Sequence, residues 1–104
     1  MNQYREERIN MIVAMMMTLA NISEEKAFKL FQSTVIYQNI VDGEECTLSE
    51  SYSANLEDVI EELQESNQND LVKNITEEAV TNLNKRMFDK GIKSAKQLKE
   101  MKMS

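Results

Sequence analysis

The chain has 104 residues, the length of one domain, and carries 18 acidic and 12 basic side chains for a formal net charge of −6. It contains no His, which excludes Ser–His and Cys–His catalytic dyads and removes the commonest metal ligand. Its single cysteine, Cys46, cannot form an internal disulfide, which favours a reducing, cytoplasmic location.

Residues 3–20 predict the first helix, because apolar side chains recur on one face at helical spacing. Met11, Met15 and Leu19 lie beside this face and make it wider than a simple surface helix needs. We therefore expect these three residues to lie at an interface with a second copy or another protein. The apolar run 11–17 is shorter than the roughly 20 residues that span a bilayer, so we expect no membrane insertion.

The segment 23–41 predicts two helices that form a hairpin. Ser23 and the two glutamates after it are typical of a capped helix start, since the hydroxyl accepts from free amides and the carboxylates oppose the helix dipole. Weaker helix formers at 32–34 predict a break, with a short helix over 35–41. Several β-branched residues in that second part leave a strand as the alternative.

The middle of the chain predicts an acidic amphipathic helix. Asp42 and Gly43 predict a turn before it, and Asn55 is a good capping residue for a helix over 56–66. The four polar residues 66–69, Ser-Asn-Gln-Asn, predict a hinge after it.

The C-terminal part predicts two more helices. Apolar residues keep helical spacing over 70–90, although Thr76, followed by two glutamates, is an alternative start. Gly91 predicts the end of this helix, and Ser94 predicts the cap of a last helix over 95–103.

Charge is divided unevenly along the chain. Residues 1–84 carry 5 basic and 16 acidic side chains, a net charge of −11, whereas residues 85–104 carry 7 basic and 2 acidic ones, a net charge of +5. This asymmetry favours a basic tail that meets an acidic surface of the same chain, a second copy or a partner; two solvated faces are the alternative. We expect the lysines Lys93, Lys96 and Lys99 to meet acidic residues such as Glu57, Glu61 and Glu65.

The sequence offers little catalytic chemistry. Its paired carboxylates are sequence neighbours on polar helix faces, whereas acid–base catalysis needs two carboxylates in different environments. The segment 42–47 supplies oxygen ligands but does not match the spacing of a calcium loop. There is no glycine-rich phosphate loop and no Cys-x-x-Cys pair. We therefore expect no catalytic residue, no cofactor and no metal.

Four segments together carry a resemblance: I-S-E-E-K-A-F-K-L-F at 22–31, T-V-I-Y-Q-N-I-V-D at 34–42, S-x-S-Y at 49–52 and D-V-I-E-E-L at 58–63. In this order they resemble a small bacterial family, domain of unknown function family 3791. With the first helix, the resemblance covers about two-thirds of the chain, and residues 67–104 lie beyond it. The aromatic and histidine positions associated with the middle of the family are missing here.

The resemblance implies a short helical bacterial protein and transfers no catalytic residue. Members of the family are often encoded beside other small genes, in some cases beside a toxin-like ADP-ribosyltransferase domain. The resemblance therefore implies an antitoxin-like or accessory binding role.

Together these observations predict an all-α protein, a compact bundle of four to six short helices. We expect a single domain over 1–104, with core helices in 3–66 and a helical extension with a basic tail in 70–104. The predicted function is a non-catalytic protein–protein interaction module that binds a protein partner or a second copy of itself. The alternative is a small regulator that binds nucleic acid through the basic C-terminal helix.

Overall fold

The computed structural model describes residues 2–66 and 70–103, without the side chains of residues 102 and 103. The described residues form helices and no strand, so the all-α prediction is confirmed. The helices are α1 (Gln3–Ala20), α2 (Glu24–Gln32), α3 (Val35–Asp42), α4 (Glu45–Leu48), α5 (Tyr52–Glu65), α6 (Glu77–Asp89) and α7 (Ala95–Met103). The single turn of α4 is the helix that the sequence did not predict.

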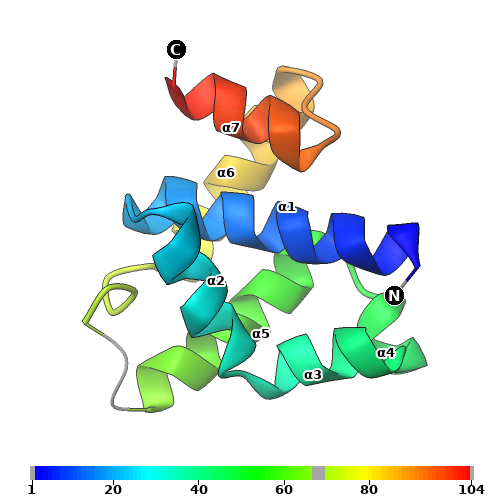
Figure 1. Cartoon of the computed structure of the whole chain (residues 1–104). Helices are drawn as coiled ribbons and strands as arrows, with labels where there is room; N and C mark the ends of the chain where they lie inside the picture. The colour runs from blue at the N-terminus through cyan, green and yellow to red at the C-terminus, as the bar shows by residue number, and fades with distance from the viewer. Residues whose placement is uncertain (1, 67–69, 104) are drawn as a thin grey trace.

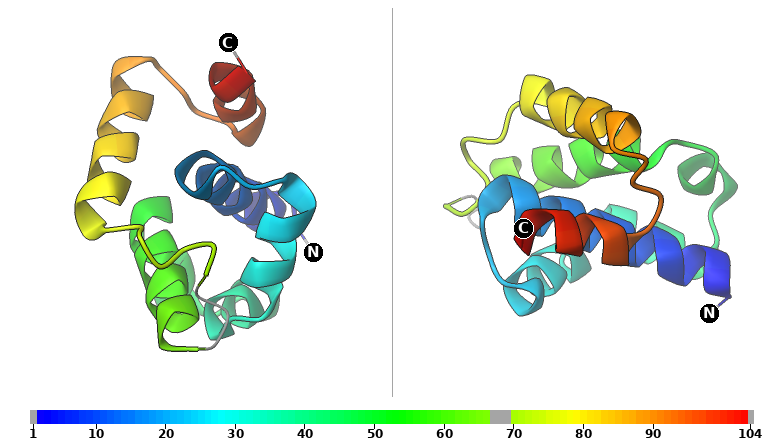
Figure 2. Two further views of the ribbon diagram at one scale, coloured as in Figure 1. Left: turned by 90° about the vertical axis from the view of Figure 1, so that its left-hand side faces the viewer. Right: turned by 90° about the horizontal axis from the view of Figure 1, so that it is seen from above.

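Helix α1 is the centre of the molecule. It crosses the middle of Figure 1, and the left view of Figure 2 shows it nearly end-on with the other helices arranged around it. Helix α7 lies along α1 in the right view of Figure 2 and makes the most extensive contact of any helix pair. Because neighbours surround α1, its side chains are buried almost continuously between Arg8 and Met16.

The two helices predicted within 23–41 are present as α2 and α3. The hydroxyl of Ser23 caps α2 by accepting from the backbone N–H of Lys26 at 3.2 Å. The chain then breaks, and the hydroxyl of Thr34 caps α3. Helix α5 reinforces that second start, because the Glu62 carboxylate accepts from the first two backbone N–H groups of α3. The strand alternative is therefore wrong.

Helix α5 begins earlier than predicted. Its N-cap is Ser51, whose hydroxyl accepts from the backbone N–H of Ala54 at 3.1 Å. Asn55, the predicted cap, lies inside the helix and is fully buried. Its side-chain oxygen accepts from the Arg8 guanidinium of α1 at 2.7 Å and therefore does not cap a helix.

The C-terminal helices end and begin at the predicted caps. Thr76 caps α6, so the alternative start is the observed one, and residues 70–74 form turns and loop. Gly91 has φ of 67°, a left-handed conformation that ends α6. The predicted hinge at 66–69 falls mostly outside the described residues; Ser66 is the C-cap of α5.

All of these helices contribute to one hydrophobic core, apart from α4, whose Leu48 packs against its edge. Phe31 from α2, Ile40 from α3 and Leu56 from α5 are among its fully buried members. Leu83 from α6 and Leu98 from α7 belong to the same cluster and are fully buried. Residues 70–103 are therefore packed into the same core as residues 2–66.

Candidate functional site

Helix α6 turns a phenylalanine toward solvent near its C-terminal end. Its buried face is formed by Val80, Leu83 and Met87. Phe88 follows Met87 by one residue and so lies about 100° further around the helix axis, away from the core. As a result 85% of its surface is exposed, more than that of any other large apolar side chain that is described. The ring is available for contact with another molecule.

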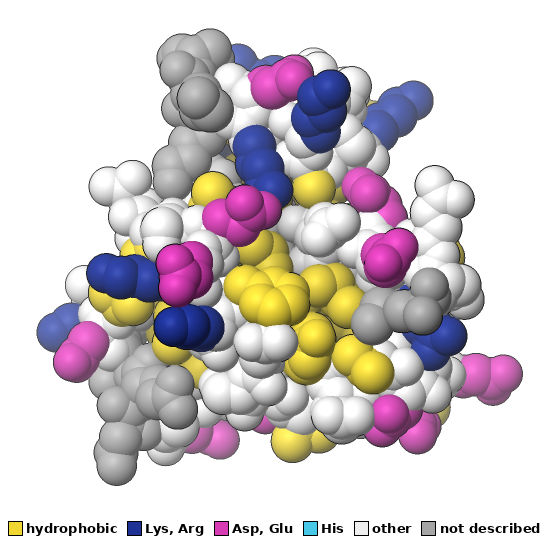
Figure 3. All heavy atoms as spheres, in the orientation of Figure 1, with side chains coloured by type: hydrophobic (Ala, Val, Ile, Leu, Met, Phe, Trp, Pro, Cys, Tyr) yellow, Lys and Arg dark blue, Asp and Glu magenta, His cyan; other side chains and the backbone are white. Residues whose placement is uncertain are grey.

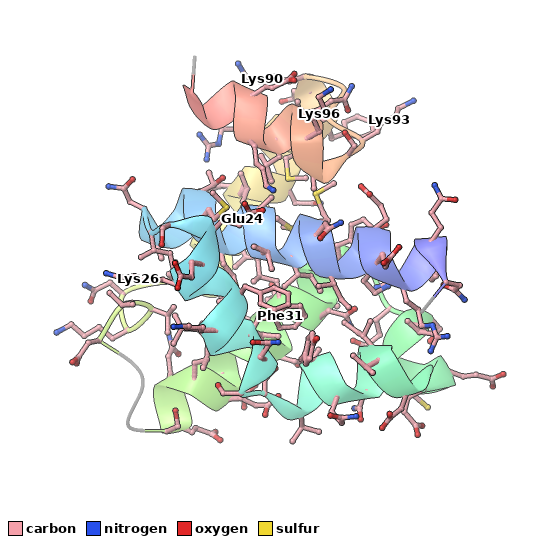
Figure 4. The ribbon with its side chains drawn as sticks, in the orientation of Figure 1. Glu24, Lys26, Phe31, Lys90, Lys93 and Lys96 are labelled. Carbon is pink, nitrogen blue, oxygen red and sulfur yellow. The ribbon has the colours of Figure 1, made fainter. Side chains whose placement is uncertain are left out.

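Basic residues are concentrated in the same part of the molecule as this ring. Figure 4 shows Lys90, Lys93 and Lys96 gathered at the top of the molecule, where α6 ends and α7 begins. These three lysines are exposed, as are Lys85 and Arg86 of α6. None of the five forms an ion pair with a described residue. We call Phe88 and these cations the basic end; the cations are Lys85, Arg86, Lys90, Lys93 and Lys96.

A small acidic hollow lies between α5 and the start of α6. Its volume is about 190 Å³. Apolar side chains form part of its lining, and three carboxylates lie among the rest. The lining residues are Glu57, Ile60, Glu61, Gln64, Ile75, Thr76, Glu77 and Val80. We call this feature the α5–α6 hollow; it combines an apolar surface with negative charge.

The carboxylates of the α5–α6 hollow affect one another. Burial raises the pKa of Glu57 above its usual value, and the negative charges of Glu77 and Asp58 raise it further. No ion pair with a Lys or Arg among the described residues relieves these charges. A cation brought to the hollow by another molecule would therefore be attracted to it.

The structure corrects the predicted interface on α1. Met11 and Met15 are 1% and 0% exposed, so neither can contact a partner, and this prediction is wrong for both. The physical reason is that α2, α3, α5, α6 and α7 all pack on α1, so its wide apolar face is covered by the chain itself. Leu19 is half-buried against the core near the end of α1.

Within one chain, the predicted lysines and glutamates do not meet. Lys99 of α7 pairs with Glu24 at the start of α2 instead. Lys93 and Lys96 remain exposed at the basic end. Of the predicted acidic partners, two line the α5–α6 hollow and the third is exposed at the end of α5; they are Glu57, Glu61 and Glu65.

Sequence reasoning did not predict the exposure of Phe88. The sequence showed it only as a lone aromatic residue in a basic segment. The sequence pattern that could have predicted it is the apolar stripe of α6. Val80, Leu83 and Met87 define the buried face of the helix, and Phe88, one residue further on, lies outside that face. Glu77 was also missed as a lining residue, since the sequence does not show that α5 lies beside it.

A second hollow opens on the face seen in Figure 3, where apolar side chains lie at the junction of α1, α2 and α3. Its volume is about 180 Å³, and Ile9, Phe28 and Tyr37 are among its lining residues. The two rings meet edge to face, with centroids 6.0 Å apart. Tyr37 also contacts the buried Phe31 in the same manner, so this hollow is the outer surface of the core.

Comparisons of the chain with protein families, curated proteins and solved structures find no match in any of the three. Among the described residues, no three His, Cys, Asp or Glu side chains are arranged to hold a metal ion. In the same part of the chain, no helix is both long enough and apolar enough to cross a membrane.

Proposed function

We propose that this chain is a non-catalytic protein–protein interaction module whose contact surface is the basic end. The observation that carries the proposal is Phe88, which is 85% exposed at a helix end rich in basic residues that have no acidic partner among the described residues. Aromatic residues and arginine are enriched among the residues that dominate binding energy at protein interfaces. The basic end joins both types on one helix terminus.

The charge of this surface indicates the chemistry of the partner. Exposed cations speed the encounter with a negatively charged protein surface, while a central aromatic ring supplies area that is removed from water. An acidic protein surface with an apolar depression therefore fits the basic end. The resemblance to family 3791 supports an antitoxin-like or accessory role toward such a partner in a bacterial cytoplasm.

The same observation favours one alternative, a regulator that binds single-stranded nucleic acid. An exposed ring among lysines can stack on a base while the cations contact phosphates. Against this alternative stands the chain's net charge of −6, which repels a polyanion outside the basic end. The protein-binding function is therefore the preferred proposal.

Site-specific photocross-linking tests the proposal. The photoreactive residue p-benzoylphenylalanine replaces Phe88 in one variant and Val35 in the control, because Val35 is 63% exposed but lies on α3, away from the basic end. Each purified variant is irradiated in a native lysate, and the products are identified by mass spectrometry. We expect a discrete protein adduct at position 88 and none at position 35.

Two results would contradict the proposal. Equal labelling at positions 88 and 35 would mean that the basic end has no preferred protein partner. Adducts to nucleic acid in place of protein would favour the alternative. That outcome is checked with a fluorescent single-stranded oligonucleotide, whose binding would fall steeply with salt and weaken in Phe88→Ser.

A further inference from the structure

One stripe of α6 carries both the exposed ring and one wall of the α5–α6 hollow. Glu77, Thr81, Asn84 and Phe88 follow one another at spacings of four, three and four residues, so they share a face of the helix. All four are exposed. Glu77 lines the hollow, and Phe88 lies about 16 Å further along the helix axis, given a rise of 1.5 Å per residue.

The charges along α6 are also ordered. Its first turn contains Glu77 and Glu78, and its C-terminal part contains Lys85 and Arg86 together with one acidic residue, Asp89; Lys90 follows directly after the helix. Lys85 precedes Phe88 by three residues and therefore lies beside the ring on the helix surface. The N-terminal end of the stripe is thus acidic and hollowed, whereas the C-terminal end is basic and carries the projecting ring.

We propose that two copies of this chain pair through α6 in antiparallel orientation, so that Phe88 of each copy enters the α5–α6 hollow of the other. The proposal rests on the proposed function and names a second copy as the partner. A two-fold axis crossing the stripe between Thr81 and Asn84 makes the two contacts equivalent, which closes the assembly at a dimer.

Complementarity of size, polarity and charge supports this occupant. The hollow, at about 190 Å³, is smaller than the roughly 300–1,000 Å³ of a typical small-molecule pocket and suits a single side chain. Its apolar lining, which includes Ile60 and Val80, suits an aromatic ring. The antiparallel arrangement also brings Lys85 toward the carboxylates Glu57, Glu61 and Glu77, which have no cation of their own among the described residues.

The mass in solution tests the dimer, measured by light scattering over a range of protein concentration. We expect a monomer–dimer equilibrium that weakens partly as salt is raised, because salt screens the charged contacts and leaves the apolar one. Phe88→Ser is expected to raise the dimer dissociation constant by about tenfold or more, the size of effect seen for a central interface residue. The control Val35→Ser changes another exposed apolar side chain, on α3, and is expected to leave the constant unchanged.

Mixing two variants tests which surfaces meet. Glu61→Arg places a long cationic side chain at the hollow and is expected to weaken the dimer, like Phe88→Ser. A mixture of these two variants keeps one intact contact, between the Phe88 of one chain and the hollow of the other. We therefore expect heterodimers to form more tightly than either variant forms homodimers. If Phe88 instead contacted Phe88 across the axis, the mixture would bind no better than Phe88→Ser alone.

A chain that stays monomeric at every concentration, or a dimer that Phe88→Ser does not weaken, would overturn the second-copy proposal. Circular dichroism of each variant shows whether the fold is retained, and the exposed positions 61 and 88 are chosen so that it is. Failure here is distinguishable from failure of the proposed function. A monomer that still gives a discrete adduct to a different protein at position 88 retains the interaction function and loses only the identity of the partner.

Discussion

The guanidinium of Arg8 donates a hydrogen bond of 2.7 Å to the side-chain oxygen of Asn55 in the interior of the protein. The amide nitrogen of Asn55 in turn donates to the backbone carbonyl of Thr47 at 3.2 Å. Arg8 is 3% exposed, and no carboxylate among the described residues pairs with it. Its other partners are backbone carbonyls and a tyrosine hydroxyl, and the rings of Tyr4 and Tyr52 lie against the guanidinium. This network joins α1 to α4 and to the first turns of α5.

Asn55→Ala is expected to destabilise the protein by about 1–3 kcal/mol, because it leaves a buried N–H of Arg8 without its acceptor. It also removes one of the two donors to the carbonyl of Thr47, which keeps its bond from the backbone N–H of Glu50. The matched control is Asn82→Ala, at an exposed position inside α6, where the free energy of unfolding should change by less than about 0.5 kcal/mol. Urea denaturation measures both. Equal effects of the two substitutions would show that the Arg8 network contributes nothing beyond helix propensity.

The same network explains where sequence reasoning about the fold succeeded and where it failed. Ser23, Thr76 and Gly91 act through their own backbone neighbours, so local sequence was enough to predict those helix ends. Asn55 has the same local signature as a cap, but its side chain is used by Arg8, 47 residues earlier in the chain. A contact between residues so far apart in the chain cannot be predicted from the spacing of neighbouring residues.

Gly43 ends α3 and is the site of a second prediction. Its φ is 77°, which side chains rarely adopt, and an added Cβ would lie 3.1 Å from Nη1 of Arg5. That nitrogen donates to the carbonyl of Val41 at 2.7 Å. Gly43→Ala should therefore cost more than the roughly 1–2 kcal/mol of left-handed strain alone.

Gly91→Ala is the control for Gly43→Ala, because Gly91 has φ of 67° but no atom within 4 Å of an added Cβ. It should cost about 1–2 kcal/mol, from backbone strain only. Thermal unfolding of both variants compares them under one condition. A larger loss for Gly91→Ala would contradict the assigned contact between Gly43 and Arg5.

The candidate site was harder to predict from the sequence than the fold. The lysines of the basic tail were visible as a charge run, and two of the predicted glutamates line the hollow. Met11 and Met15 were misassigned because a wide apolar face has the same sequence pattern whether a partner or the chain's own helices cover it. Phe88 needed the orientation of α6 relative to the core, which depends on how the helices pack.

The packing of α7 on α1 gives a third prediction, in which burial should outweigh charge. Leu98 is fully buried, so Leu98→Ala should destabilise the protein by about 2–5 kcal/mol. Lys99 pairs with Glu24, but both side chains keep contact with solvent, so Lys99→Ala should cost less than about 1 kcal/mol. Denaturation measures the losses, and amide hydrogen exchange in α7 locates them. A larger effect of Lys99→Ala would mean that the ion pair, and not the core, holds α7.

The raised pKa of Glu57 predicts how stability depends on pH. Burial is the main cause of the rise, followed by the charges of Glu77 and Asp58, so the folded protein holds this proton more tightly than the unfolded chain does. The contribution of Glu57 to stability is therefore most favourable below its unfolded pKa. It declines as the pH rises through the interval up to the folded pKa, and a constant cost remains above it.

Glu57→Gln removes this ionisation and should stabilise the protein at neutral pH, with a gain that shrinks as the pH falls through the interval. Urea midpoints measured at a series of pH values test this. Glu65→Gln is the comparison, because Glu65 is exposed at the end of α5 and does not line the hollow. A gain from Glu57→Gln that grew toward acid pH would contradict the direction of the shift. The same substitution removes one negative charge from the α5–α6 hollow, so it should also weaken the proposed dimer at low salt while it strengthens the fold.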